Sequence, residues 1–407
     1  MFRTLRILAA IAVSVGLGLA AVQPAQAAPA ALVSLNPTSG PAGSQVTVSG
    51  TGFRVSTAGT VIVGSATFAF TTTSTGSFSS PITIPTTATG NVTVTAKTSS
   101  IKASAIFTVT AAPPSALPPV STAALGFGVA TAGGPLASAE LDEVSRVAGE
   151  SPSTILFYKD FLQAPPIAEM NAARARGAVP LVTWEPWAWG GGLDQPAYAL
   201  DRIAAGDFDA YITQWGQALA SWGQPVKLRF AHEMNGNWYP WAEGVNGNTA
   251  GDYVAAWRHV HDVVAATGAS NVSWVWSPNV PYLGSTDLAG LFPGAQYVDV
   301  VALDGYNWGT SASWSAWISP QDLFAPGIAQ LRSLAPGLPI LISETASSEA
   351  GGSKAAWNTD LISYLAAQPD VAGFVWFNLN KETDWRINSS DSSATAFKNA
   401  LAARRAS

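Results

Sequence analysis

The segment 226–233 reads Val-Lys-Leu-Arg-Phe-Ala-His-Glu, a largely apolar run that ends in two polar residues. Similar runs recur through the second part of the chain, separated by amphipathic stretches. Short apolar runs that alternate with helical stretches are typical of parallel strands joined by helices. The expected strands are Leu125–Thr131, Thr154–Asp160, Val179–Glu185, Val226–Glu233, Val272–Pro278, Val298–Tyr306, Pro339–Thr345 and Val371–Asn378.

Between these strands the sequence has the period of helices, as in Phe208–Trp222, Tyr253–Thr267 and Ala355–Ala367. Eight strand–helix units over roughly 290 residues match the size of a (β/α)8 TIM barrel. A doubly wound open sheet is the alternative, but it would leave two strand edges to be covered. We therefore predict an α/β fold, a (β/α)8 barrel, over residues 120–407.

The chain before the barrel has a different composition. Residues 32–110 are rich in Thr, Ser, Val and Gly, and stretches such as 45–49 alternate apolar and polar side chains. This pattern predicts a small all-β, immunoglobulin-like sandwich over residues 28–110. The opening stretch 35–53 resembles that of the IPT/TIG domains. Residues 111–119 contain four prolines and are expected to form a semi-rigid linker.

The first residues have the pattern of a secretion signal. Arg3 and Arg6 precede the apolar run Leu8–Ala21, which is short for a membrane span. Ala25-Gln26-Ala27 then offers small residues at a cleavage site. We expect residues 1–27 to be a signal peptide and the protein to be secreted and extracellular.

The amino-acid composition limits which classes of substrate and binding partner the protein suits. Hydrophobic residues make up 48% of the chain and charged residues 11%, so a large core can form. The net charge of −6 gives no basic surface suited to nucleic acid or to an anionic membrane. The chain has no cysteine, which rules out disulfides and thiolate metal ligands. A neutral substrate fits this balance, and we expect a monomer.

Two of the expected strands carry a glutamate where the apolar run meets the following loop: Glu233 and Glu344. In a β/α-barrel the active site is built at these carboxyl ends of the strands. Either glutamate alone could form a structural ion pair, but two carboxylates facing each other are what glycoside hydrolysis requires. The aromatic neighbours of Glu233 could raise its pKa and keep it protonated. We predict Glu233 to be the acid/base and Glu344 the nucleophile of a retaining glycosidase.

Tryptophan is frequent in the barrel, and the chain has sixteen. Indole faces stack on pyranose rings, whereas Trp215, Trp222 and Trp257 fall inside helical stretches and are expected in the core. Those at strand ends or in loops are Trp184, Trp187, Trp189, Trp238, Trp241, Trp276, Trp308 and Trp376.

Other chemistries have weaker support. His259 and His261 lie two apart on an expected helix and so point to different faces, which makes a poor metal pair. The glycines at 190–192 follow no phosphate-binding spacing. We expect no cofactor and no metal, although a bound calcium stays open.

The segment Arg229-Phe230-Ala231-His232-Glu233-Met234-Asn235-Gly236-Asn237-Trp238 closely resembles the acid/base motif of glycoside hydrolase family 26. Weaker matches follow in the correct order along the chain. They are Leu303–Trp308, Ile342–Thr345 and Phe374–Asn378.

The resemblance implies a retaining barrel with Glu233 as acid/base and Glu344 as nucleophile. It implies that Tyr306 hydrogen-bonds the nucleophile and that Trp376 is the aromatic platform under the sugar at the cleavage point. Strand parity places Arg229 and Asp304 on the inward face, where we expect them to hold the carboxylates. The other residues expected to bind substrate are His232, Trp238, Trp184, Glu185, Asn378 and Arg386.

Family members cut β-linked plant cell-wall polysaccharides, mostly β-1,4-mannan internally, and some cut mixed-linkage β-1,3-1,4-glucan or β-1,3-xylan. Phe377 stands where some mannanases carry an arginine that grips the neighbouring mannose. Glu382 or Arg386 could replace that contact. Mannan is the first expectation and mixed-linkage glucan the second. A non-catalytic carbohydrate-binding protein is the alternative of a different class.

Overall fold

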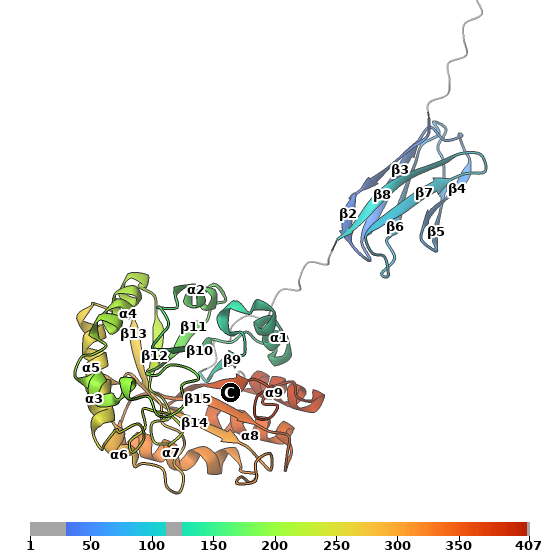
Figure 1. Cartoon of the computed structure of the whole chain (residues 1–407). Helices are drawn as coiled ribbons and strands as arrows, with labels where there is room; N and C mark the ends of the chain where they lie inside the picture. The colour runs from blue at the N-terminus through green and yellow to red at the C-terminus, as the bar shows by residue number, and fades with distance from the viewer. Residues whose placement is uncertain (1–29, 111–123, 405–407) are drawn as a thin grey trace, which may run out of the picture. The chain divides into compact units, whose positions relative to one another are not determined.

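The computed structural model describes residues 30–110 and 124–404, which form two compact units (Figure 1). The expected signal peptide, at residues 1–27, and the expected linker, at 111–119, lie outside the described residues. Among the described helices none is long and apolar enough to cross a membrane.

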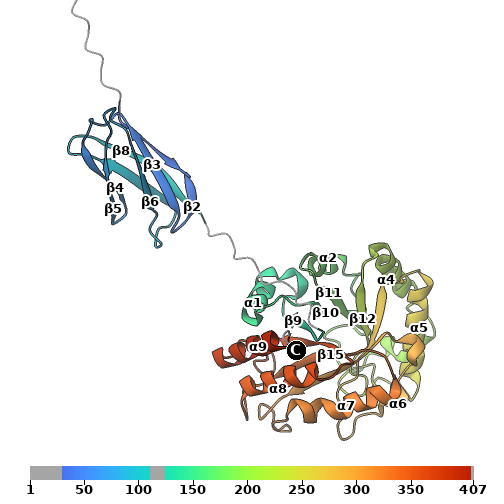
Figure 2. The ribbon, with the colours of Figure 1, turned by 180° about the vertical axis from the view of Figure 1, so that it is seen from behind.

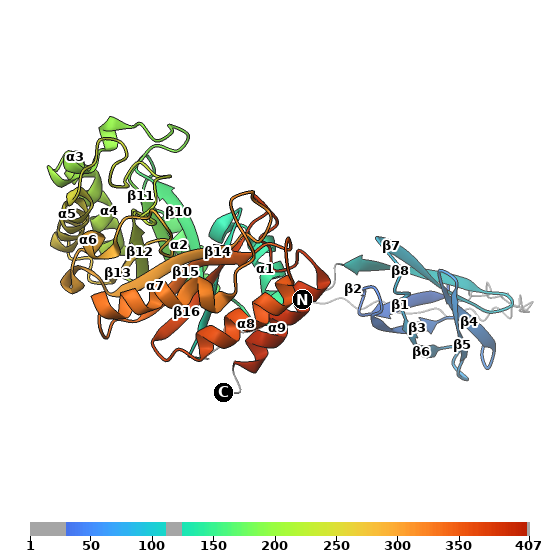
Figure 3. The ribbon, with the colours of Figure 1, turned by 90° about the horizontal axis from the view of Figure 1, so that it is seen from below.

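The first unit consists of two β-sheets, seen most openly in Figure 3. One sheet has the order β1-β3-β6 and the other β2-β8-β7-β4-β5. Alternate residues such as Val46, Val48, Val61, Val94 and Phe107 are buried between them, as the period of two requires. The all-β class is confirmed, and the IPT/TIG assignment stays a prediction. The strands are β1 Leu32–Asn36, β2 Ser39–Pro41, β3 Gln45–Thr51, β4 Ala58–Val63, β5 Ala66–Thr71, β6 Phe78–Thr83, β7 Asn91–Lys97 and β8 Lys102–Thr110.

The second unit is a closed parallel barrel in which each strand pairs with the next in sequence and β16 pairs with β9. The barrel is therefore confirmed, and the open doubly wound sheet is excluded. Its strands are β9 Gly126–Thr131, β10 Thr154–Asp160, β11 Val179–Glu185, β12 Val226–Phe230, β13 Val272–Trp276, β14 Val300–Asn307, β15 Ile340–Ser347 and β16 Val371–Asn378.

Helices surround this barrel on the outside, as the view from behind makes clear (Figure 2). Large buried side chains such as Trp215, Trp257 and Trp357 fill the layer between helices and strands. Ser319, Ser353 and Ser390 cap their helices by accepting a backbone N–H. The helices are α1 Ser138–Ala148, α2 Ile167–Ala175, α3 Leu200–Ala204, α4 Asp209–Trp222, α5 Asp252–Ala266, α6 Leu288–Leu291, α7 Pro320–Leu334, α8 Lys354–Ala366 and α9 Asp391–Ala403.

The strand β12 ends earlier than the sequence suggests, at Phe230 rather than Glu233. Ala231 and Glu233 have positive φ angles of 44° and 52°, a left-handed conformation that ends a strand. Such a conformation costs about 1–3 kcal/mol for residues other than glycine, and it occurs preferentially at functional sites. The turn changes the direction of the chain within the motif, between Arg229 and Glu233, which the period of the apolar run cannot reveal.

Candidate active site

The carboxylate of Glu344, on β15, lies at the mouth of the barrel and accepts three hydrogen bonds. Tyr158 Oη, from β10, donates to it over 2.9 Å. The guanidinium of Arg229, from β12, and the hydroxyl of Tyr306, from β14, donate to it as well. One cationic and two phenolic donors stabilise the negative charge and fix the direction of the carboxylate oxygens.

Arg229 is completely buried and is held by a second carboxylate. Its Nη1 donates to both oxygens of Asp304, over 3.0 and 2.8 Å. Its Nε and Nη2 donate to the hydroxyl of Thr183 over 2.9 and 2.7 Å. Burial opposes the charge of the guanidinium, but the carboxylates Asp304 and Glu344 outweigh it and raise the pKa of Arg229. The expectation that Arg229 and Asp304 lie inward and hold a catalytic carboxylate agrees with these contacts.

Glu233 has only neutral hydrogen-bond donors. Its carboxyl accepts from Trp238 Nε1 over 2.7 Å and from Asn279 Nδ2 over 3.1 Å. Its own backbone N–H donates to Ser277 O over 2.7 Å, which ties the turn after β12 to the end of β13. Asn235 fixes the same junction, since it exchanges two hydrogen bonds of 2.9 Å with the backbone of Asn279.

The surroundings of Glu233 favour its neutral form. Burial, and next the charge of Glu344, raise its pKa to about 7, while the Trp238 and Asn279 hydrogen bonds act in the opposite direction. A carboxyl with this pKa can give up and regain a proton near neutral pH, as a general acid/base must. The charge of Glu344 therefore acts on Glu233, and the two glutamates differ in their donors, which are a cation and two phenols at Glu344 and an indole and an amide at Glu233.

His232 lies beneath this site and is neutral. Burial, and next the charge of Arg229, lower its pKa well below the usual value. Its ring packs 4.8 Å from the ring of Tyr239, 5.7 Å from that of Trp241 and 6.3 Å from that of Tyr158. Its contacts are thus aromatic, and it supports the floor of the site as a packing partner.

Glu185, at the end of β11, is a third carboxyl at the mouth. Both indole donors that reach it, Trp187 Nε1 at 3.0 Å and Trp189 Nε1, bind the same oxygen, Oε2. Burial raises the pKa of Glu185 to about 7, with the indole bonds opposing. The charges of Arg229 and Glu344 also act on the pKa of Glu185, which places this carboxyl near the nucleophile candidate.

Two tryptophans expected to bind sugar do not face the mouth. Trp184 is completely buried, stacks on Trp215 of α4 at 4.5 Å and donates to Tyr211. Trp376 is completely buried too, with its ring 5.0 Å from that of Phe397 on α9. Because side chains alternate along a strand, the neighbours of inward-facing residues point outward to the helices. Trp376 therefore cannot be the platform that the resemblance implied.

Asn378 and Arg386, also expected to bind sugar, shape the loop after β16. Asn378 Oδ1 accepts from the backbone of Ile387 over 2.8 Å. Arg386 forms an ion pair with Asp384 on the same loop, with bonds of 2.8 and 2.7 Å. Neither is brought into contact with a catalytic carboxyl. Arg386 remains partly exposed at the rim.

Four residues of the site were missed from the sequence: Tyr158, Asn279, Tyr282 and Trp385. Tyr158 and Asn279 hydrogen-bond the two glutamates, and the ring of Tyr282 stacks on Trp238 at 5.8 Å. The signal for Tyr158 was available, since it lies near the end of an expected strand. The loop residues Tyr282 and Trp385 had no comparable signal, because their positions depend on how two loops fold.

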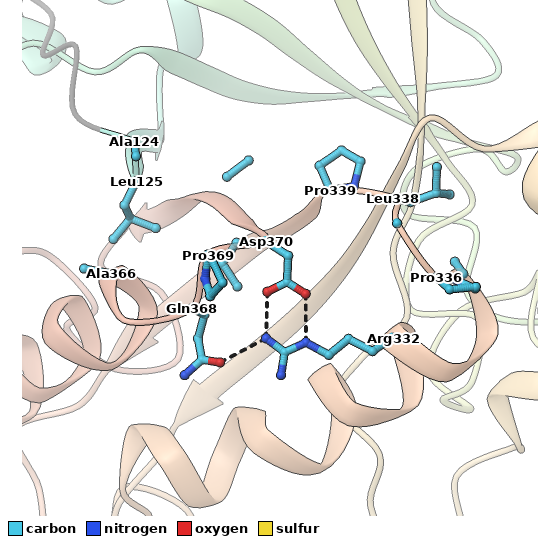
Figure 4. A pocket seen from close by; sticks show the side chains of 14 residues that line it. Ala124, Leu125, Arg332, Pro336, Leu338, Pro339, Ala366, Gln368, Pro369 and Asp370 are labelled. Carbon is cyan, nitrogen blue, oxygen red and sulfur yellow. Dashed lines mark hydrogen bonds and ion pairs between the residues drawn. The ribbon is translucent and has the colours of Figure 1, made fainter.

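A pocket of about 580 Å³ lies at the other end of the barrel, near the start of β15 and β16 (Figure 4). Its wall carries the ion pair of Arg332 with Asp370, with bonds of 2.8 and 2.6 Å, and Gln368 accepts from the same guanidinium. It contains none of the site residues described above. In the described ranges, no group of three His, Cys, Asp or Glu side chains is arranged to hold a metal ion.

Comparison with known proteins agrees with this geometry. Residues 169–338 match the model of glycosyl hydrolase family 26. Over this segment the barrel is similar to members of that family. The matched segment contains Glu233 and stops just short of the strand that carries Glu344.

Two curated relatives differ in how much of this chain they match. Endoglucanase H of Acetivibrio thermocellus is 41% identical over 249 residues, which are 60% of this chain and 26% of that enzyme. Mannan endo-1,4-β-mannosidase A and B of Caldalkalibacillus mannanilyticus is 40% identical over 90 residues, 21% of this chain and 17% of that enzyme. The chain thus spans about a quarter or less of the length of these relatives.

Among solved structures, a family 26 β-mannanase from Bacteroides ovatus superposes with a TM-score of 0.53 at 19% identity, covering 70% of this chain and 90% of that one. At this identity the likeness concerns the fold.

Proposed function

We propose that the barrel hydrolyses internal β-linkages of a polysaccharide by double displacement, with retention of configuration at the anomeric carbon. The observation that carries the proposal is the pairing of two glutamates with different hydrogen-bond donors. Glu344 receives one cationic and two phenolic hydrogen bonds. Glu233 has a pKa raised to about 7. One group is prepared to attack and the other to donate a proton.

In the first step, Glu344 attacks the anomeric carbon while protonated Glu233 gives its proton to the glycosidic oxygen. The bond between the anomeric carbon and that oxygen breaks, the leaving sugar departs as an alcohol, and an ester joins the sugar to Glu344. Tyr158, Tyr306 and Arg229 hold the carboxylate oxygens in place for the attack.

In the second step, Glu233, now ionised, takes a proton from a water molecule that attacks the same carbon. The ester breaks, Glu344 is released as a carboxylate, and Glu233 is again protonated. Two inversions at one carbon leave its configuration unchanged. Proton NMR of a fresh digest tests this, because the β-anomer should appear first and the α-anomer only through later mutarotation. Initial release of the α-anomer would contradict the proposal.

For the substrate we favour β-glucan, with mixed-linkage β-1,3-1,4-glucan as the first choice. The match to the endoglucanase extends over 249 residues, whereas that to the mannosidase extends over 90. Phe377 adds a structural reason. It is buried and packs edge to face on Tyr306 at 5.6 Å, so no guanidinium stands there to grip a mannose.

Mannan is the second candidate, because several curated relatives are named as mannan-cleaving enzymes and 40% identity is reached locally. Reducing-sugar release on barley β-glucan, carboxymethyl cellulose, glucomannan, galactomannan and β-1,3-xylan separates the candidates. Release from barley glucan alone supports the first choice, and release from the mannans alone supports the second. Binding without release from any of the five would favour a non-catalytic carbohydrate-binding protein.

Export is part of the proposal. A polysaccharide is too large to enter a cell, and residues 1–27 have the composition of a signal peptide. N-terminal sequencing of protein recovered from a culture medium should begin at Ala28. We propose that the secreted enzyme acts as a monomer and needs no cofactor, since the two glutamates supply the proton and the nucleophile.

A further inference from the structure

The loop between β14 and α7 carries an exposed indole. Trp314 is 72% exposed, although a large apolar side chain usually gains stability from burial. Its loop is fixed at both ends. Ser315 Oγ donates to Gly309 O over 2.6 Å, and the Ile318 backbone N–H donates to Asn307 Oδ1 over 3.1 Å. The exposed ring therefore lies on a loop at the mouth of the barrel that is fixed by hydrogen bonds.

A row of aromatic rings connects Trp314 with the nucleophile. The ring of Trp314 lies 5.1 Å from that of Trp308, and the ring of Trp308 lies 4.9 Å from that of Trp385. Trp385 in turn lies 5.2 Å from Tyr306, whose hydroxyl donates to Glu344. These four rings, called the aromatic row below, come from the end of β14, from the loop between β14 and α7, and from the loop after β16. The row is continuous with the proposed active site.

Charged side chains border the aromatic row. Trp385 Nε1 donates to Glu382 over 3.1 Å, and Lys381 pairs with Glu382 over 2.8 Å. Asp384 and Arg386 form a second pair on the same loop, and all four side chains are partly exposed. Trp385 is itself buried, so the exposed ring of the row is that of Trp314. An exposed ring together with charged hydrogen-bonding groups is the combination that binds a pyranose, whose C–H faces are apolar and whose hydroxyls need polar partners.

The position of the aromatic row relative to the two glutamates indicates which part of the substrate chain it contacts. Trp238 and Tyr282 stack on each other beside Glu233, the group that protonates the leaving sugar. The leaving-group side of the cleft therefore lies there. The aromatic row starts instead from Tyr306 at Glu344, the group that attacks the sugar to be retained.

We propose that Trp314 and Trp308 form a distal subsite for a pyranose ring of the substrate chain, on the side of the sugar that Glu344 attacks. This proposal rests on the proposed function. The subsite would be filled only by a chain that extends beyond the sugar at the cleavage point. It would therefore favour polymers and longer oligosaccharides over short ones.

The test compares a long and a short substrate in one variant. Trp314→Ala should lower kcat/KM on the polysaccharide about three- to tenfold, the size of one aromatic contact. The loss should appear mainly in KM. On an aryl glycoside of a single sugar or a disaccharide the variant should match the wild type. Trp222→Ala, at the end of α4, is the matched control and should leave both values unchanged.

Equal loss on both substrates, or no loss on either, would overturn the subsite. A wild type that hydrolyses no polysaccharide would overturn the proposed function instead. The subsite is then tested by affinity electrophoresis in gels that contain barley β-glucan or glucomannan. Weaker retardation of Trp314→Ala than of wild type and of Trp222→Ala supports it, and equal retardation or no retardation of any of them overturns it.

Discussion

The two glutamates at the mouth of the barrel are the same residue type in opposite surroundings. Glu344 accepts from Arg229, Tyr158 and Tyr306, so its negative charge is met by a cation and two phenols. Glu233 accepts from one indole and one amide, and burial raises its pKa to about 7. The donors around a carboxyl, and not the carboxyl itself, therefore decide between nucleophile and acid.

The nucleophile should be the most sensitive residue. Glu344→Gln keeps the shape of the side chain but removes the attacking oxygen charge, so kcat should fall by about 10⁴-fold or more on every substrate. Initial rates on polysaccharide and on an activated aryl glycoside measure this. Glu143→Gln, on the exposed face of α1, is a matched control that should retain full activity. Activity of Glu344→Gln within tenfold of wild type would contradict the assignment.

The acid/base should show a loss that depends on the leaving group. Glu233→Gln should lower kcat on the polysaccharide by about 10²–10⁴-fold, because a sugar alcohol leaves poorly without a proton. An aryl glycoside with a good leaving group needs little protonation in the first step, so its ester should form at a rate close to that of wild type. Burst kinetics with the aryl substrate provide the measurement. If the burst rate on the aryl substrate fell by the same factor as kcat on the polysaccharide, Glu233 would have another role.

The donors to Glu344 should have intermediate effects. Tyr306→Phe removes one hydrogen bond to a charged group, which is worth about 1.5–3 kcal/mol, and should lower kcat by about 10- to 100-fold. Tyr158→Phe should do the same, because its hydroxyl binds the other oxygen of the carboxylate. Melting temperatures serve as the control for folding. If both variants retained wild-type kcat, the donors would not be needed for the attack.

The smallest expected effect is a change in the pH profile. Glu233 must be protonated to act as an acid, so kcat/KM should fall as pH rises through its pKa of about 7. The Trp238 hydrogen bond favours the ionised form, and its removal should raise the pKa. Trp238→Phe should therefore move the basic limb to higher pH, whereas Trp222→Phe should leave it in place. A basic limb that moved to lower pH would contradict this account of Glu233.

The barrel and both glutamates could be predicted from the sequence, because apolar periodicity and strand-end position carry that information locally. Arg229 and Asp304 were found by strand parity for the same reason. The same parity places Trp184 and Trp376 on the outward face, where both rings pack against helices, so the prediction that they bind sugar is wrong. The backbone turn at Ala231 and Glu233 could not be predicted from the sequence, since the Glu233 backbone N–H donates to Ser277 O, a residue that directly follows the neighbouring strand β13. Loop residues such as Tyr282, Trp385 and Trp314 depend on the course of whole loops.

Double displacement requires that Glu344 becomes bonded to the sugar, and a mechanism-based trap can capture that ester. An activated 2-deoxy-2-fluoro glycoside slows the second step and lets the ester accumulate. Peptide mass spectrometry after incubation should place one sugar on the peptide that contains Glu344, and Glu344→Gln should remain unlabelled. A sugar on Glu233 or Glu185, or no label in an enzyme that turns over the corresponding non-fluorinated glycoside, would contradict the account.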